Sequence, residues 1–185
     1  MLTWIVPLIV VAVAVAIVVM FNRLVRARQM AREGWSGIDV QLKRRSDLVP
    51  NLVDSVKSYA AHERDVLTKV TELRGAARAL PADAVAQRAA AETALTAALG
   101  RLVAMAEAYP DLKASGNFLK LQQQLSDMES EIQMARRYYN GAARNLNILI
   151  ESFPSNLIAG TFGFAHMDYF ELNDTAERAA PAVSV

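Results

Sequence analysis

The stretch VQLKRRSDLVPNLVDS, residues 40–55, places a proline and three consecutive basic residues inside a pattern that predicts one helix. Positions spaced alternately by three and four residues form a first apolar stripe, in which twelve of fourteen members are apolar. Such spacing is typical of a helix with coiled-coil-like packing. The stripe comprises Trp35, Ile38, Leu42, Arg45, Val49, Leu52, Val56, Tyr59, Glu63, Val66, Val70, Leu73, Ala77 and Leu80.

Pro50 does not interrupt this spacing. Val49 and Leu52 stay in phase on either side of it, so the sequence predicts a kinked helix that continues through the proline. Because a proline has no N–H, the Ser46 carbonyl loses its helical partner.

Two further stripes follow and predict two more helices. The second is Val85, Arg88, Glu92, Leu95, Leu99, Leu102, Ala106 and Tyr109; the third is Phe118, Leu121, Leu125, Met128, Ile132, Ala135, Tyr139, Ala142, Leu146, Leu149 and Phe153. Pro81, Pro110 and Pro154 mark the ends. We therefore expect helices over about 32–80, 82–109 and 115–153.

The N-terminal segment from Leu2 to Phe21 is apolar apart from Thr3. As a helix it would span about 30 Å, the thickness of a bilayer core. A cleaved signal peptide is the alternative, but the segment lacks a basic start and arginines stand where a cleavage site would be. The predicted fold is all-α, with a transmembrane anchor (1–22) followed by an elongated antiparallel three- to four-helix coiled-coil-like bundle in a body (23–172).

Arg23, Arg26, Arg28 and Arg32 follow the anchor directly. The positive-inside rule then places the N-terminus outside and the body in the cytoplasm. These juxtamembrane arginines either contact anionic lipid headgroups or only set the orientation. The remaining residues, 33–185, hold 16 basic and 19 acidic side chains, a balance that argues against nucleic-acid binding.

The C-terminal segment, 155–172, is apolar and aromatic without a long period. Phe162, Phe164, Tyr169 and Phe170 are too many large apolar side chains to leave in water. The segment either folds back onto the bundle or forms a docking surface. Residues 173–185 are predicted to be a disordered tail.

Residues with catalytic potential do not form a recognisable motif. His62 and Glu63 resemble the start of a zinc-protease motif, but Val66 stands where the second histidine is required. His166 is alone in the C-terminal segment, and a single histidine makes a poor metal site. We predict no catalytic residue, no metal and no cofactor, and a protein that is not an enzyme.

Charged residues in the stripes are candidates for specific contacts. Arg45 and Glu63 lie mid-stripe, where burial without a partner would cost several kcal/mol, so each should find one. Arg88 and Glu92 lie near a predicted turn, where exposure would explain them. The residues expected to mediate assembly or partner contact are Arg45, Pro50, Glu63, Phe162, Phe164, Tyr169 and Phe170.

Three blocks of the chain resemble the LemA family: WSGIDVQLKRRSDLVPNLVDSVKSYAAHE (35–63), LVAMAEAYPDLKASGNFLKLQQQLSDMESEIQMARRYYN (102–140) and FPSNLIAGTFGFAHMDYFEL (153–172). The resemblance implies a single-pass bacterial membrane protein with a helical-bundle body and no agreed biochemical activity. It also implies kinship with a protein of magnetosome formation, which points to membrane organisation.

Two functions fit these observations. The second predicted helix is too short to cover the other two, so the C-terminal segment or another copy must cover them. A self-assembling scaffold at the inner membrane leaflet would meet this need as a homo-oligomer. An adaptor that recruits a membrane protease or signalling partner is the alternative.

Overall fold

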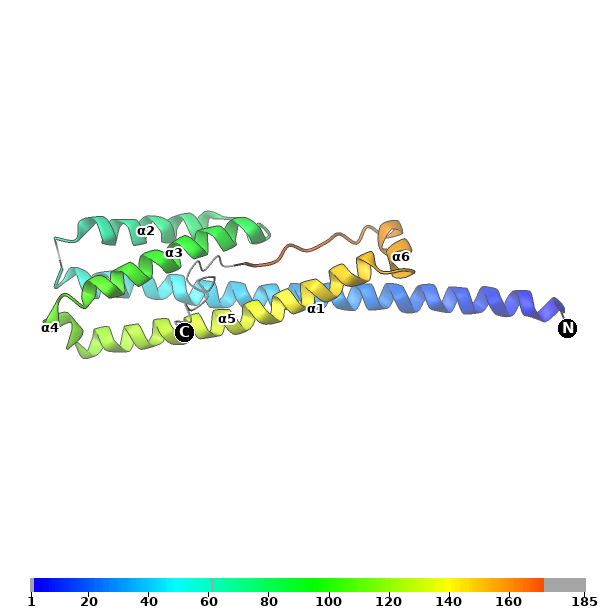
Figure 1. Cartoon of the computed structure of the whole chain (residues 1–185), viewed down its shortest axis with the longest axis horizontal. Coiled ribbons are helices and arrows are strands. Elements are labelled where there is room, and N and C mark those ends of the chain that lie inside the picture. The colour runs from blue at the N-terminus through cyan, green and yellow to red at the C-terminus, as the bar shows by residue number, and fades with distance from the viewer. Residues whose placement is uncertain (1, 61, 172–185) are drawn as a thin grey trace, which may run out of the picture. The chain divides into compact units, whose positions relative to one another are not determined.

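The structure is a computed structural model that describes residues 2–60 and 62–171 (Figure 1). The described residues form helices, turns and extended connections without a strand, and a long apolar helix comes first. The predicted all-α class is confirmed. The helices are α1 (Leu2–Lys57), α2 (Arg64–Ala79), α3 (Val85–Ala106), α4 (Pro110–Lys113), α5 (Gly116–Glu151) and α6 (Ser155–Thr161).

The chain divides into two compact units, which share α1 and α5. Of the described residues, the first unit holds 2–38 and 135–169, and the second holds 39–60, 62–134 and 170–171. The tail predicted over 173–185, with Leu172, lies outside the described residues.

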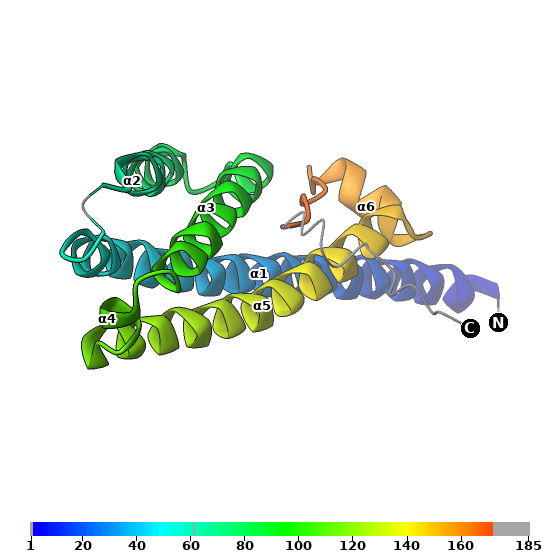
Figure 2. The same cartoon turned by 60° about the vertical axis from the view of Figure 1, so that its left-hand side comes forward.

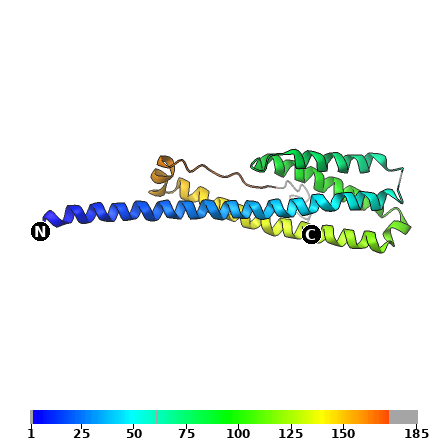
Figure 3. The ribbon, with the colours of Figure 1, turned by 180° about the vertical axis from the view of Figure 1, so that it is seen from behind.

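Helix α1 is one continuous element, as Figure 3 shows. It runs from the apolar N-terminal segment into the first apolar stripe and passes through Pro50 without interruption. From Trp4 to Val15 its side chains are exposed. Among the described residues, α1 and α3 are long and apolar enough to cross a membrane, but α3 lies in the bundle and buries Arg88 and Glu92 there.

The single helix expected over 32–80 is wrong. Helix α1 ends at Lys57 and α2 begins at Arg64. Ser58 Oγ donates to the Asp54 carbonyl at 3.1 Å, one way in which serine competes with helical hydrogen bonds. The sequence did not reveal this turn, because the three-four spacing of apolar residues continues from α1 into α2. Folding back buries Leu67 and Val70, which a straight helix would have left in water.

The second unit is a four-helix bundle built from the last part of α1, α2, α3 and the first part of α5. Figures 1 and 2 show α2 and α3 lying side by side. Its core is formed by Leu48, Val49, Leu52, Val56, Ala60, Leu67, Val70, Leu95, Ala98, Leu99, Leu102, Ala106, Leu112, Phe118, Leu121 and Leu125.

This bundle changes the expectation that the C-terminal segment or another copy must cover the apolar stripes. Because the predicted first helix is two helices, four segments cover one another instead of three. Val49, Leu52 and Val56 of the first stripe are buried within the chain, as are Leu121 and Leu125 of the third. A second copy is therefore not needed to bury these apolar stripes.

In the first unit the C-terminal segment folds back onto α1 and α5. Its core comprises Leu24, Ala27, Leu146, Ala159 and Phe164. Asn147 Nδ2 donates to the Met167 carbonyl at 3.0 Å, and the Met167 N–H donates to Asn147 Oδ1 at 2.9 Å. The amide side chain thus holds an extended segment as a neighbouring strand would.

Tyr139 holds the same segment from a buried position. Its hydroxyl donates to the Asp168 carbonyl at 2.6 Å, and its ring lies 5.4 Å from that of Trp35. Burial, and then the Asp168 carboxylate, raise the pKa of Tyr139 to about 12. The hydroxyl therefore remains a donor throughout the neutral pH range.

Gly34 allows α1 and α5 to approach closely. A Cβ at this position would lie 3.0 Å from Tyr139 Cα and 3.0 Å from Tyr138 Cδ1. The Tyr139 contact is with backbone and cannot be relieved by a rotamer change. At Gly37, three residues further along α1, a Cβ would meet nothing within 4 Å.

We expect Gly34→Ala to lower the free energy of unfolding by about 1–3 kcal/mol, since the added methyl overpacks the helix contact. Gly37→Ala is the matched control and should be neutral or stabilising by about 0.4–1 kcal/mol. Thermal unfolding of the detergent-solubilised protein, followed by circular dichroism, measures both. Equal effects of the two substitutions would contradict the close approach at Gly34.

Candidate functional site

The most unusual feature of the second unit is a charged group in its core. Arg45 of α1 is fully buried. Its guanidinium pairs with Glu92 of α3 through Nη2 and with Glu129 of α5 through Nη1. Nη1 also donates to Thr96 Oγ1 at 2.7 Å. These four residues, the Arg45 network, connect three helices through one side chain.

The apolar stripes predicted only part of this network. Arg45 is buried with partners, as expected of a charge mid-stripe. Arg88 and Glu92, interpreted as exposed, are in fact buried. Being four residues apart, they share the inward face of α3, and α1 offers each an opposite charge. Glu92 meets Arg45, and Arg88 Nη1 lies 2.6 Å from Asp39 Oδ1.

Pro50 contributes to a second link, between α1 and α2. Its missing N–H frees the Ser46 carbonyl, and Arg74 Nε of α2 donates to that oxygen at 2.7 Å. One turn further along α2, Arg78 pairs with the exposed Asp47 at 3.2 Å. The proline thus creates an acceptor on α1 that a cationic side chain of α2 uses.

Glu63 lies in the connection between α1 and α2, and its predicted partner exists. The Tyr109 hydroxyl donates to Glu63 Oε1 at 3.3 Å. Partial desolvation, and then the Glu63 carboxylate, raise the pKa of Tyr109. This contact joins the α1–α2 connection to the turn between α3 and α4.

The chemistry of these groups is structural. Arginine side chains stay protonated at physiological pH. Arg45 therefore forms ion pairs with the carboxylates of Glu92 and Glu129. Within residues 2–60 and 62–171, no three histidine or carboxylate side chains are grouped to hold a metal ion. The arrangement offers charge pairing and fixes the register of three helices.

The juxtamembrane arginines divide into two kinds. Arg23, Arg26 and Arg32 are exposed and available to headgroups. Arg28 is half-buried, with its guanidinium carbon 4.7 Å from the centre of the Phe164 ring. This cation–π contact ties Arg28 to the C-terminal segment.

The four aromatic residues proposed for assembly also divide. Phe164 and Phe170 are buried, whereas Phe162 and Tyr169 are exposed. The segment therefore serves chiefly as a cover for its own chain. Phe162 remains available for a contact outside the chain.

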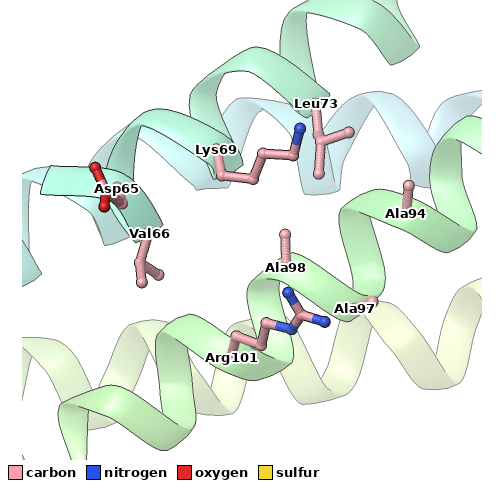
Figure 4. Close-up of a pocket in the computed structure, with 8 residues that line it drawn as sticks. All are labelled: Asp65, Val66, Lys69, Leu73, Ala94, Ala97, Ala98 and Arg101. Carbon is pink, nitrogen blue, oxygen red and sulfur yellow. The ribbon is translucent and has the colours of Figure 1, made fainter. Parts of the chain in front are cut away.

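A groove between α2 and α3 was not predicted from the sequence. It encloses about 690 Å³ and is lined by Asp65, Val66, Lys69, Leu73, Ala94, Ala97, Ala98 and Arg101. Figure 4 shows Ala94 and Ala98 of α3 projecting toward α2. Lys69 and Arg101 lie between Asp65 at one end of the groove and Leu73 at the other. The alanine-rich composition of 89–98 was the only available signal, and it indicates close helix packing equally well.

Comparison with known proteins identifies the relatives of this chain. A family model described as the LemA family matches residues 34–185. The chain belongs to the LemA family. The resemblance seen in the three sequence blocks is thus confirmed.

Individual LemA-family relatives are similar over most of this chain. Magnetosome protein MamQ of Magnetospirillum gryphiswaldense is 26% identical over 184 residues, covering 86% of this chain and 68% of that protein. Magnetosome protein MamQ 2 of Paramagnetospirillum magneticum is 27% identical over 186 residues, covering 88% and 68%. Protein LemA of Metamycoplasma hominis is 28% identical over 153 residues, covering 83% and 69%.

For this LemA-family bundle, Arg45→Met should cost about 3–5 kcal/mol of unfolding free energy, because it leaves the Glu92 carboxylate buried without its partner. Arg45→Met combined with Glu92→Met should recover much of that loss. Arg44→Met, an exposed neighbour, should change stability by less than about 0.5 kcal/mol. Chemical denaturation monitored by circular dichroism distinguishes these cases. A double variant as unstable as Arg45→Met would argue against the pairing.

The link at Pro50 can be tested with a double-mutant cycle. Arg74→Met should destabilise the protein, but by about 1 kcal/mol less when Pro50→Ala is present, because the new alanine N–H then gives the Ser46 carbonyl a helical donor. Arg78→Met is the control, since its exposed pair with Asp47 should be independent of residue 50. Strict additivity for Arg74 and Pro50 in denaturation curves would show that the carbonyl is not shared.

Proposed function

We propose that this protein is a membrane-anchored scaffold, without catalytic activity, whose copies associate through the second unit at the inner leaflet. Membership of the LemA family and similarity to magnetosome proteins support a membrane-associated, non-enzymatic helical protein. The anchor is the apolar start of α1, with the N-terminus outside and the helical body cytoplasmic by the positive-inside rule.

The observation that carries the proposal is the α2–α3 groove. Val66, Leu73 and Ala98 give it an apolar floor. Small side chains allow an incoming helix to approach closely, and a volume of about 690 Å³ accommodates several side chains of such a helix. The groove thus has the features of surfaces that bind amphipathic helices.

The charges at the groove edge favour a second copy as the occupant. Asp65 stands at the same groove as Lys69 and Arg101. Two copies related by a two-fold axis can therefore place the acid of each opposite a base of the other. A self-complementary surface of this kind is what a symmetric dimer contact requires.

The exposed juxtamembrane arginines would let such an assembly attract anionic lipids. Each exposed Arg near an anionic leaflet contributes about 1 kcal/mol of attraction. Arg23, Arg26 and Arg32 of every copy would be brought together when copies associate. The scaffold would thereby concentrate anionic lipid beneath it.

An adaptor is the second candidate. Its supporting observation is another groove, of about 640 Å³, on the α1 side of α2, lined by Val53, Lys57, Arg64, Leu67, Thr68, Thr71 and Glu72. If copies associate through the α2–α3 groove, the groove between α1 and α2 stays free to bind a different protein, such as a membrane protease or signalling partner.

Ala97→Arg should abolish self-association, since Ala97 is exposed and lines the α2–α3 groove. A long charged side chain there fills the groove without entering the core. The measurement is the mass of the full-length protein in lipid nanodiscs or detergent at micromolar concentration, where the unmodified protein is expected to be oligomeric.

Gln124→Arg introduces the same side chain at an exposed position of α5 outside the groove and should leave the mass unchanged. A monomeric unmodified protein would refute the scaffold. An oligomer that persists with Ala97→Arg would refute the groove as its contact.

A further inference from the structure

The turn between α5 and α6 and the residues around α6, 152–164, form what we call the α5–α6 corner (Figure 2). Three large apolar side chains of this corner are exposed: Phe153 at 79%, Leu157 at 60% and Phe162 at 54%. They project from one short segment, whereas Ala159 and Phe164 of the same segment are buried in the first unit. The corner therefore has a buried side and an uncovered apolar side.

The corner also lacks charge. From Ser152 to Ala165 there is no acidic or basic side chain. In the sequence the corner is flanked by Glu151 and His166, whose Oε1 and Nδ1 atoms lie 3.6 Å apart. In space, the Arg28 guanidinium lies against its Phe164 ring. A surface that contacts another protein normally has a polar rim, whereas an uncharged segment with exposed apolar side chains suits the boundary between headgroups and acyl chains.

Contacts with α1 place the corner beside the end of the apolar N-terminal segment. The ring of Phe21, the last residue of that segment, packs edge-to-face against Phe162 at 4.9 Å and Phe164 at 5.8 Å. If Phe21 lies where the bilayer core ends, Phe162 lies at the same level. The exposed Arg23 and Arg26 follow within the next turn and a half, where lipid phosphates would be.

Several polar backbone groups in and next to the corner have hydrogen-bond partners, which favours insertion among acyl chains. Ser155 Oγ donates to the carbonyls of Leu149 and Ser152, and Thr161 Oγ1 donates to that of Leu157. Beyond the last residue of α6, Thr161, Gly163 has a φ of 67°, and the Phe164 N–H donates to the Ala159 carbonyl at 3.0 Å. This Schellman-type ending separates the exposed Phe162 from the buried Phe164.

We infer that the α5–α6 corner inserts into the lipid leaflet at which α1 leaves the membrane. Phe153, Leu157 and Phe162 occupy the boundary between headgroups and acyl chains, as the apolar faces of interfacial helices do. The protein then holds the bilayer at two places, the apolar start of α1 and this corner. The inference rests on the membrane anchor of the proposed function.

The absence of cysteine makes a direct test possible. Leu157→Cys in the full-length protein, labelled with a bimane fluorophore and reconstituted into phosphatidylglycerol-containing vesicles, should lose fluorescence when the lipids are brominated. Bromines near the headgroup should quench it more strongly than bromines near the chain ends, because the corner lies at the boundary. Val13→Cys, near the middle of the apolar segment, should show the reverse depth preference.

Leu119→Cys is the matched control, since Leu119 is also a large apolar side chain, 49% exposed, on α5. It should be quenched by neither lipid. Quenching of Val13→Cys without quenching of Leu157→Cys would overturn the inference while preserving the anchor. An unquenched Val13→Cys would overturn the anchor and the inference together. Self-association is tested separately by the mass measurement, so failure of the scaffold and failure of corner insertion can be distinguished.

Discussion

The burial of Arg45 is the constraint on which the second unit depends. A guanidinium cannot shed its charge, so its removal from water must be offset by carboxylates at fixed positions. Glu92 and Glu129 supply them from two other helices. A slide of α3 or α5 by one turn would leave either the cation or an acid buried alone. Packing of Leu and Val alone would tolerate such a slide, whereas the Arg45 network does not.

The proline in the same helix solves a related problem for α2. Buried or half-buried carbonyls that lack a helical partner are costly, and Pro50 creates one at Ser46. Arg74 satisfies it from α2, so the defect in α1 becomes an attachment point. Together with the pair of Arg78 and Asp47, this link holds α2 against α1. Basic and acidic residues in VQLKRRSDLVPNLVDS thus serve as contacts among helices, with Arg45 in the core and Asp47 at the surface.

The three-four spacing predicted most of the buried positions, because burial of one face is what creates that spacing. It was wrong at Tyr59 and Phe153, which are exposed. It predicted Arg45 as a buried cation by the same reasoning. The turn after Lys57 escaped prediction because the apolar phase continues across it, and no glycine or proline marks it. The partners of Arg45 escaped because pairing between helices depends on how they align in space. The contacts of Asn147 and Tyr139 with the C-terminal segment were not predicted. Their hydrogen bonds go to backbone groups, which have no sequence signature.

The α5–α6 corner and the juxtamembrane arginines would restrict the rotation of α1 about its own axis in the bilayer. One apolar helix can rotate about its own axis in a bilayer, since its surface is apolar on every side; tilt and rotation are set by packing and by anchors at the interface. In the first unit the corner lies against one side of α1 only, at Phe21. Lipid contact through Phe153, Leu157 and Phe162 would therefore select one rotation of α1, with Arg23 and Arg26 at the headgroups. The first unit of every copy would then meet the leaflet in one common orientation.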